Sequence, residues 1–311
     1  MNSAPICSFQ PLKNKELSMG THYLENYANS GLYTMQGRLS PPEEGRFQSF
    51  PRSAWEREIE LAPQVPLRGI EWIYDLYGEG ANPLESPQGR EALQGKLSQT
   101  GQKVVSICAD YFMDCPFVHP DATIRAYRLE KIKFLISICQ KMDIKRIVLP
   151  FVDASKITDR SATNTVLQVL HTVLPEAQSA GVELHLETDM GPAAFRSFLN
   201  EIEHPLVRVN YDSGNSCSLG YKPSEEFSAY GHRIGSFHIK DRLLGGKTVP
   251  LGQGDADFAS LRAGLLDIDY QGDFVLQVAR GEPGDELAWL AQMNTVACQW
   301  LRGEAILHSG N

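Results

Sequence analysis

The feature that most constrains the fold of this 311-residue chain is an alternation of short β-rich runs with longer amphipathic stretches. The stretches, such as SAWEREIELAPQV and AYRLEKIKFLISICQKM, repeat apolar residues at intervals of three and four, as helices packed on one side do. Eight runs read as buried strands. They are GLYTM (31–35), GIEWIYD (69–75), KVVSICADYF (103–112), KRIVLPF (145–151), VELHLET (182–188), VRVNYD (207–212), IGSFHIK (234–240) and DFVLQVA (273–279).

Strand and helix pairs without a break in composition predict a single (β/α)8 TIM barrel, of fold class α/β, over residues 31–302. A doubly wound sheet of two domains is the alternative. It usually carries a phosphate-binding GxGxxG after its first strand, and none occurs there. Residues 1–30 are expected to be an N-terminal extension, either a mobile arm or an oligomer or lid contact, and residues 303–311 a C-terminal tail.

Composition excludes several classes of protein. Hydrophobic residues make up 42% and charged residues 22% of the chain, which indicates a folded, soluble protein. The net charge of -9 would repel a phosphate backbone, so nucleic acid is not an expected partner. No segment approaches the roughly 20 apolar residues that span a bilayer, and the first thirty residues lack a signal peptide's pattern. The six cysteines form no CxxC pair, so they read as reduced thiols in a cytoplasmic protein.

In such a barrel the functional residues lie at the carboxyl ends of the strands. The ends of the last four predicted strands carry Glu187, Asp212, His238 and Gln277. Glu71, Asp75 and Asp110 stand near the ends of the second and third. Two carboxylates and an imidazole delivered to one rim make a site for one divalent ion, either Mn, Mg, Co or Zn. The alternative is that each is a lone polar residue that caps a strand or pairs with an arginine.

Several segments carry a resemblance to a known family. LHLETD, VNYDSGNS, SFHIKD with VPLGQGDADF, MQGRLSP and GIEWIYD resemble the xylose isomerase-like TIM barrels, and most of all the L-ribulose-5-phosphate or L-xylulose-5-phosphate 3-epimerase group. The resemblance implies a metal-dependent isomerase or epimerase acting on a sugar, keto-sugar or sugar phosphate through an ene-diolate intermediate. It also implies that Glu187, Asp212, His238 and the residue at 277 hold the metal, with Glu187 as the catalytic base.

Two positions depart from the family's pattern, which has glutamate where this chain has Gln253 and Gln277. Glutamine can offer an oxygen to a metal, but it cannot carry a proton at neutral pH. Epimerisation needs a second proton carrier on the opposite face of the substrate, for which Asp110, Lys240 and Asp241 are candidates. Two alternatives therefore stay open: a keto-sugar dehydratase or lyase, and a non-catalytic sugar-binding barrel. An endonuclease on this barrel is disfavoured, because the strand ends supply too few metal ligands.

Further residues are candidates for contacts with the substrate. They are His185, Asn215, Lys240, Arg38, Trp72 and Asp110. For His185 a satisfied core histidine is an equal alternative, for Arg38 a solvated loop charge is the commoner case, and aromatic residues such as Trp72 are more often core. The expected partner is a small carbohydrate. A dimer or tetramer is expected only because such barrels often associate through helices near the rim.

Overall fold

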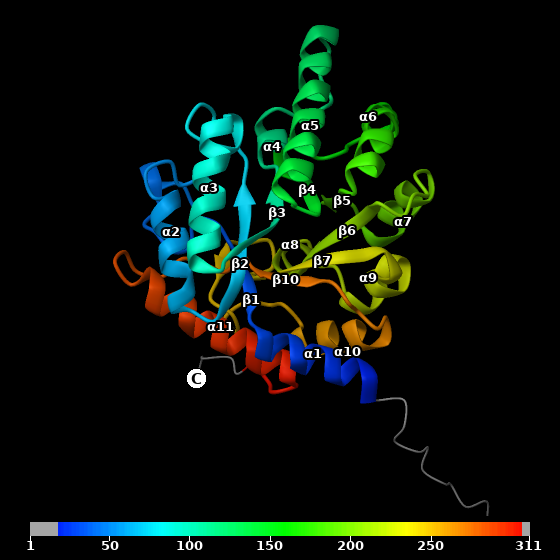
Figure 1. Cartoon of the computed structure of the whole chain (residues 1–311). Helices are drawn as coiled ribbons and strands as arrows, with labels where there is room; N and C mark the ends of the chain where they lie inside the picture. The colour runs from blue at the N-terminus through cyan, green and yellow to red at the C-terminus, as the bar shows by residue number, and fades with distance from the viewer. Residues whose placement is uncertain (1–17, 307–311) are drawn as a thin grey trace, which may run out of the picture.

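A computed structural model describes residues 18–306 as a closed barrel of parallel strands surrounded by helices (Figure 1). Around the barrel the strands follow the order β1, β10, β7, β6, β5, β4, β3, β2. Each strand pairs in parallel with both neighbours, and β10 closes the ring on β1. The predicted single (β/α)8 TIM barrel is confirmed.

The eight barrel strands of residues 18–306 each overlap one of the predicted runs. They are β1 (Leu32–Met35), β2 (Leu67–Ile73), β3 (Lys103–Cys108), β4 (Arg146–Phe151), β5 (Glu183–Thr188), β6 (Val207–Asp212), β7 (Ile234–Ile239) and β10 (Asp273–Leu276). The run expected over 273–279 is shorter than predicted, so Gln277 follows the strand instead of lying inside it. Its backbone N–H still donates to the Ile239 carbonyl at 3.1 Å.

Helix α1 precedes the first strand, and the other helices follow strands around the barrel (Figure 1). They are α1 (Ser18–Ser30), α2 (Trp55–Leu61), α3 (Pro87–Thr100), α4 (Tyr111–Asp114), α5 (Ala122–Met142), α6 (Arg160–Ala180), α7 (Pro192–Asn200), α8 (Ser213–Ser218), α9 (Pro223–Tyr230), α10 (Phe258–Asp267) and α11 (Glu286–Arg302). A small antiparallel hairpin of β8 (Asp241–Arg242) and β9 (Thr248–Val249) follows β7. Every helix within the described part of the chain is too short or too polar to cross a membrane.

Local sequence fixes where the longest helices begin and end. The Asp121 carboxylate accepts the Thr123 N–H at 2.7 Å at the start of α5, and Asp159 accepts the Ala162 N–H at 2.8 Å at the start of α6. Gly181 ends α6 at a φ of 67°, a left-handed conformation that costs glycine little. These caps set the lengths of the helices and return the chain to the base of the barrel for the next strand.

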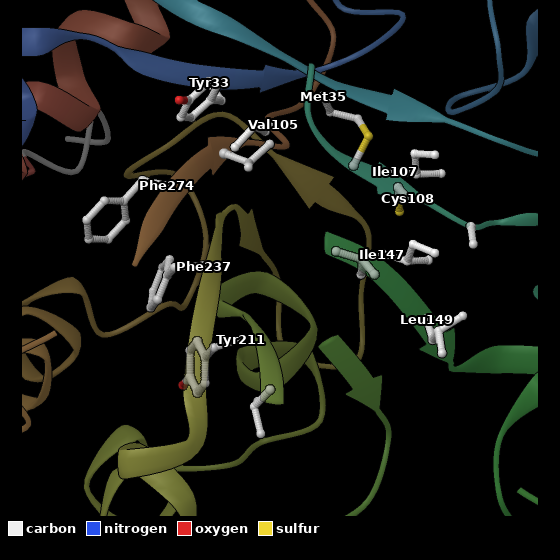
Figure 2. Packing of buried hydrophobic residues seen from close by; sticks show 14 of the residues in the cluster. Tyr33, Met35, Val105, Ile107, Cys108, Ile147, Leu149, Tyr211, Phe237 and Phe274 are labelled. Atoms are coloured by element: carbon white, nitrogen blue, oxygen red, sulfur yellow. The ribbon is translucent and has the colours of Figure 1, made fainter. Parts of the chain in front are cut away.

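Aromatic rings fill the layer between the strands and the outer helices. Figure 2 shows Tyr33, Phe274, Phe237 and Tyr211, which come from the neighbouring strands β1, β10, β7 and β6. The rings of Tyr211 and Phe237 stack with centroids 5.1 Å apart. Because successive strand residues point to opposite faces, this outward packing turns the adjacent Asp212 and His238 into the barrel. The same alternation therefore builds the core and aims the polar residues at the site.

Helix α1 covers the base of the barrel beside α11 (Figure 1). Leu24, Tyr27 and Ala28 are buried, and the Tyr27 hydroxyl donates to the Asp273 carboxylate at 2.8 Å. Residues 18–30 therefore pack on the barrel, which corrects the expectation of an arm for this part of the extension. The remainder of that extension, 1–17, and the last part of the expected tail, 307–311, lie outside the described residues. The domain boundaries themselves stay predictions.

Candidate metal centre

Three strand ends bring their side chains together inside the mouth of the barrel. Glu187 stands near the end of β5, Asp212 ends β6, and His238 lies opposite Asp212 in the register of β7. One ligand atom from each lies within 4.8 Å of the other two, and all three residues are buried. The trio predicted from the sequence is therefore one cluster in space, although its three members are far apart along the chain.

Glu71 on β2 holds the imidazole of His238 from behind. Its Oε1 lies 2.7 Å from His238 Nε2, and its Oε2 accepts the Ser106 hydroxyl at 2.5 Å. His238 Nδ1 then faces the mouth, 3.5 Å from Glu187 Oε2. A carboxylate on the far nitrogen is how proteins orient a metal-binding histidine. Glu71 was expected near a strand end but without a role in the site, since only the fold sets β2 across from β7.

The charges of the cluster act strongly on one another. Burial, together with the neighbouring Asp212, raises the pKa of Glu187 to about 7. Burial also opposes the charge of Asp212, but Lys240 and His238 lower the pKa of that carboxyl to about 2. Burial alone would lower the pKa of His238, whereas its carboxylate neighbours, Glu71 foremost, raise it well above the usual range. The acids thus concentrate negative charge around one imidazole, and a bound cation would relieve their repulsion.

Amide groups fix the orientation of Glu187. Asn210 Nδ2 donates to Glu187 Oε2 at 2.8 Å, and Asn215 Nδ2 donates to Oε1 at 2.6 Å. Asn215 follows Asp212 in α8, and its backbone N–H is in turn held by the Asp212 carboxylate at 2.8 Å. The candidate Asn215 is therefore part of the cluster.

Lys240 lies beside the trio and reaches the residue at the fourth strand end. Its Nζ donates to Asp212 Oδ2 at 3.2 Å, to Asn215 Oδ1 at 3.2 Å and to Gln277 Oε1 at 3.0 Å. The Gln277 amide group also donates from Nε2 to Gln48 Oε1 at 3.0 Å. Gln277 therefore points into the mouth, where its oxygen meets an ammonium group.

The remaining candidates for substrate contact lie in different surroundings. His185 is fully buried one layer below the mouth, where Nδ1 meets the Ser236 hydroxyl at 2.7 Å and Nε2 meets Glu183 at 2.8 Å. Trp72 is fully buried on the outer side of β2, because Glu71 beside it points inward, and its ring packs against Trp55. The structure does not bring Trp72 to the site.

Arg38 is buried beneath the mouth and not displayed at its edge. Its Nε donates to the Val278 carbonyl at 2.9 Å, and its Nη2 donates to Gln48 Oε1 at 3.2 Å. Burial, helped by the nearby Arg280, lowers the pKa of Arg38 to about 9. Asp110 follows β3 at the mouth and accepts the Gln48 Nε2 amide at 2.8 Å. Gln48, which the sequence analysis did not single out, thus joins Arg38 and Asp110 to the fourth strand end.

The trio fits a divalent metal ion. Two carboxylates and an imidazole are donors that Mn, Mg, Co and Zn accept, and three protein ligands leave positions for a substrate. The carboxylate behind His238 supplies the supporting contact that such sites use. The Gln277 oxygen already accepts a hydrogen bond from Lys240 at 3.0 Å, which leaves it one lone pair.

Comparison with known proteins assigns the chain to a family. The model of the xylose isomerase-like TIM barrel matches residues 53–294. The chain belongs to this family. A curated relative, the L-ribulose-5-phosphate 3-epimerase UlaE of Shigella flexneri serotype 5b (strain 8401), is 25% identical over 259 residues, which cover 80% of this chain and 89% of the relative.

Solved structures of the family share the fold. The IolI protein with a bound zinc atom superposes with a TM-score of 0.69 at 18% identity, covering 86% of this chain and 97% of that one. A xylose isomerase-like TIM barrel protein from Mycobacterium smegmatis in complex with magnesium gives a TM-score of 0.66 at 16% identity, covering 88% and 98%. Sugar epimerases thus stand among the relatives, and neighbours of this fold bind zinc or magnesium.

Proposed function

We propose that the protein is a divalent-metal-dependent isomerase or epimerase that acts on a sugar, keto-sugar or sugar phosphate. The observation that carries the proposal is the trio Glu187, Asp212 and His238, whose ligand atoms lie within 4.8 Å of one another at the carboxyl ends of three strands. The L-ribulose-5-phosphate 3-epimerase relative supports a carbohydrate substrate. The site is lined by amide, carboxylate and ammonium groups that suit the hydroxyl groups of a sugar.

Glu187, Asp212 and His238 would hold the ion. A divalent cation bound there supplies Lewis acidity, which makes the proton next to a substrate carbonyl easier to remove. Which of Mn, Mg, Co or Zn serves is left to metal analysis, since the donor set accepts each of them.

Glu187 is the base in this proposal. Without a metal, burial and Asp212 raise the pKa of this carboxyl to about 7. A carboxylate at the strand end can take up and return a proton as a general base. The amides of Asn210 and Asn215 hold the two carboxylate oxygens in one orientation. Such positioning keeps the base directed at a bound molecule.

Solvent deuterium exchange tests the proposal. The metal-loaded protein, incubated in D2O with L-ribulose, L-xylulose and their 5-phosphates, should place deuterium on the carbon next to the carbonyl of at least one of them. Glu187→Gln should lower this exchange by about 10²–10⁴-fold, which is the usual contribution of a general base. Asp189→Asn is a matched control, because that nearby carboxylate accepts the Asp153 N–H and lies outside the trio.

Absence of exchange with every sugar and metal would contradict the proposal, and so would undiminished exchange by Glu187→Gln. A keto-sugar dehydratase or lyase is the second candidate, because the amide of Gln277 cannot carry a proton and elimination of water needs only one base. Loss of water from the substrate, followed by mass spectrometry, would identify it. Tight binding of a sugar without exchange or elimination would instead identify a sugar-binding barrel.

A further inference from the structure

We propose that Asp110, which is joined through Gln48 and Gln277 to Lys240 across the mouth of the barrel, is the second proton carrier of the reaction. The inference rests on the proposed function, in which Glu187 removes the first proton. It assigns to β3 the acid and base role that the amide at position 277 cannot perform.

Asp110 is placed where a bound molecule can reach it. It comes two residues after the end of β3, at the carboxyl edge of the barrel. It is partly exposed, unlike the three buried residues of the trio. It stands immediately before the short helix α4, yet its carboxylate does not cap that helix. Asp110 therefore has no evident role in ending the strand or starting the helix.

The carboxylate of Asp110 accepts hydrogen bonds from uncharged donors. Within residues 18–306, Gln48 Nε2 donates to Oδ2 at 2.8 Å and Cys108 Sγ donates to Oδ1 at 3.1 Å. Burial, outweighing these two donors, raises the pKa of Asp110 to about 6. A structural carboxylate is commonly paired with a cation, whereas this one is kept close to the protonation midpoint that proton transfer requires.

A series of hydrogen bonds connects Lys240 to Asp110, and each one is donated toward Asp110. Lys240 Nζ donates to Gln277 Oε1 at 3.0 Å, Gln277 Nε2 donates to Gln48 Oε1 at 3.0 Å, and Gln48 Nε2 donates to Asp110 Oδ2. Arg38 Nη2 also donates to Gln48 Oε1 at 3.2 Å. With its oxygen held by two donors, Gln48 must turn its NH2 group toward Asp110.

This chain of bonds explains an amide at position 277. A glutamate there could accept from Lys240 but could not donate to Gln48 Oε1. Gln48 would then lose one of the two donors on its oxygen, which weakens the orientation of its NH2 group toward Asp110. Gln277 and Asp110 are therefore matched: the amide at the end of β10 supports an acid at the end of β3.

Asp110 shares its surroundings with Glu187. Besides burial, the charges of Asp110, Glu71 and Glu187 all raise the pKa of the Cys108 thiol, so these carboxylates lie around one point of the barrel. Glu187 comes from β5 and Asp110 from the end of β3, with β4 between the two strands. The two acids therefore reach the mouth from two strands that β4 separates.

The other candidates for the second carrier are engaged elsewhere. Asp241 is fully buried and accepts the backbone N–H groups of Gly252 at 2.9 Å, Gly254 at 3.0 Å and Ala256 at 3.2 Å. It therefore shapes the 252–256 loop. The ammonium group of Lys240 is shared among Asp212, Asn215 and Gln277.

The proton balance is simple. Glu187 takes the proton from the carbon next to the carbonyl on one face, and the substrate becomes an ene-diolate. Asp110, in the fraction of molecules in which it is protonated, gives its proton to the other face of the same carbon, which inverts that centre. Glu187 is left protonated and Asp110 ionised, and both return to the starting state by exchange with water.

The test separates the two proton transfers in the metal-loaded enzyme, with L-ribulose 5-phosphate and L-ribulose in D2O as probes. Asp110→Asn should reduce formation of the 3-epimer by about 10²–10⁴-fold while deuterium exchange into recovered substrate, which needs Glu187 alone, continues. Gln48→Ala should reduce epimer formation less, since it removes the support of Asp110 and not the acid. Asp114→Asn, which changes an exposed acid in the adjoining helix α4, is the control and should change neither rate.

Unchanged epimer formation by Asp110→Asn would overturn the inference, as would wild-type exchange without any epimer. A wild-type enzyme that neither exchanges nor epimerises would overturn the proposed function itself. If Asp110→Asn fails to fold, Gln48→Ala decides the matter: an epimer rate equal to wild type overturns the link from position 277 to Asp110.

Discussion

Two histidines inside the same barrel show how neighbours, and not burial, decide what a buried side chain does. His185 on β5 and His238 on β7 are both fully buried, and each has its Nε2 within 2.8 Å of a glutamate oxygen. Burial, with only partial compensation by Glu183, lowers the pKa of His185 to about 4. The pKa of His238 instead lies well above its usual range.

The surroundings of Nδ1, the second ring nitrogen, explain why the pKa values of the two histidines differ. His185 Nδ1 meets the Ser236 hydroxyl, and the charges of Arg146 and Arg208 act against a proton on its ring. His238 Nδ1 faces Glu187 Oε2 at 3.5 Å and Asp212 Oδ2 at 3.9 Å. The lower histidine is therefore a neutral part of the core, whereas the upper one lies in a field that attracts a proton or a metal ion.

Replacement of the glutamate beside each histidine should give the largest difference in metal affinity between the two sites. Glu71→Gln should weaken Mn²⁺ binding by about 10–100-fold, because supporting carboxylates contribute that much to metal affinity. Glu183→Gln is the matched control, since it changes the same kind of contact on His185 and should leave the metal affinity unchanged. Isothermal titration of both variants with Mn²⁺ measures this. Equal losses in the two variants would refute the separate roles given to the histidines.

Acidification should act on the metal centre around His238 and leave His185 unchanged. Between about pH 8 and 6, Glu187 with its pKa of about 7 takes up a proton that a metal must displace. His238, whose pKa lies well above its usual range, holds a further proton that a metal must displace. Metal affinity should therefore fall as the pH falls, by about tenfold per unit for each displaced proton. His185, with its pKa near 4, stays neutral over this range.

Calorimetry in two buffers of different ionisation enthalpy counts the protons that Mn²⁺ releases. The number of protons released on Mn²⁺ binding should be measurable near neutral pH and should be smaller for the Glu187→Gln variant. Binding that is independent of pH would contradict the assignment of Glu187 and His238 as ligands.

Gln277→Glu should give the smallest change in metal affinity. The new carboxylate adds a negative charge beside the trio, but Lys240 Nζ lies 3.0 Å from that position and neutralises most of it. We expect Mn²⁺ binding to tighten by less than about tenfold. Epimer formation should fall, since Gln48 would lose one of the two donors that orient it toward Asp110. Metal titration and the epimerisation assay measure the two effects, and faster epimer formation would contradict this account of position 277.

Much of the site could be predicted from the order of strands and the identity of their last residues. Glu187, Asp212 and His238 stand near the ends of consecutive strands, and parallel strands in a barrel must bring those ends to one rim. Trp72 could not be placed in this way. It precedes a strand end by one residue, and only the inward position of Glu71 shows that it faces the helices.

Neither the contacts of Gln48 nor the role of Glu71 could be predicted from the sequence, for a different reason. Gln48 lies in a loop with no periodic pattern, and its partners Asp110 and Gln277 are 62 and 229 residues away. Glu71 meets His238 across the interior of the barrel, a pairing that depends on which strands stand opposite each other when the ring closes.

The barrel, its eight strands and the trio at three strand ends could be predicted from the sequence, because hydrophobic periodicity and strand polarity are local properties of the chain. The folded structure was needed to show which of two buried histidines attracts a proton and what surrounds the glutamine after the last strand. Those outcomes depend on the distances between charges and on the direction of each hydrogen bond, which are fixed only when the barrel is closed.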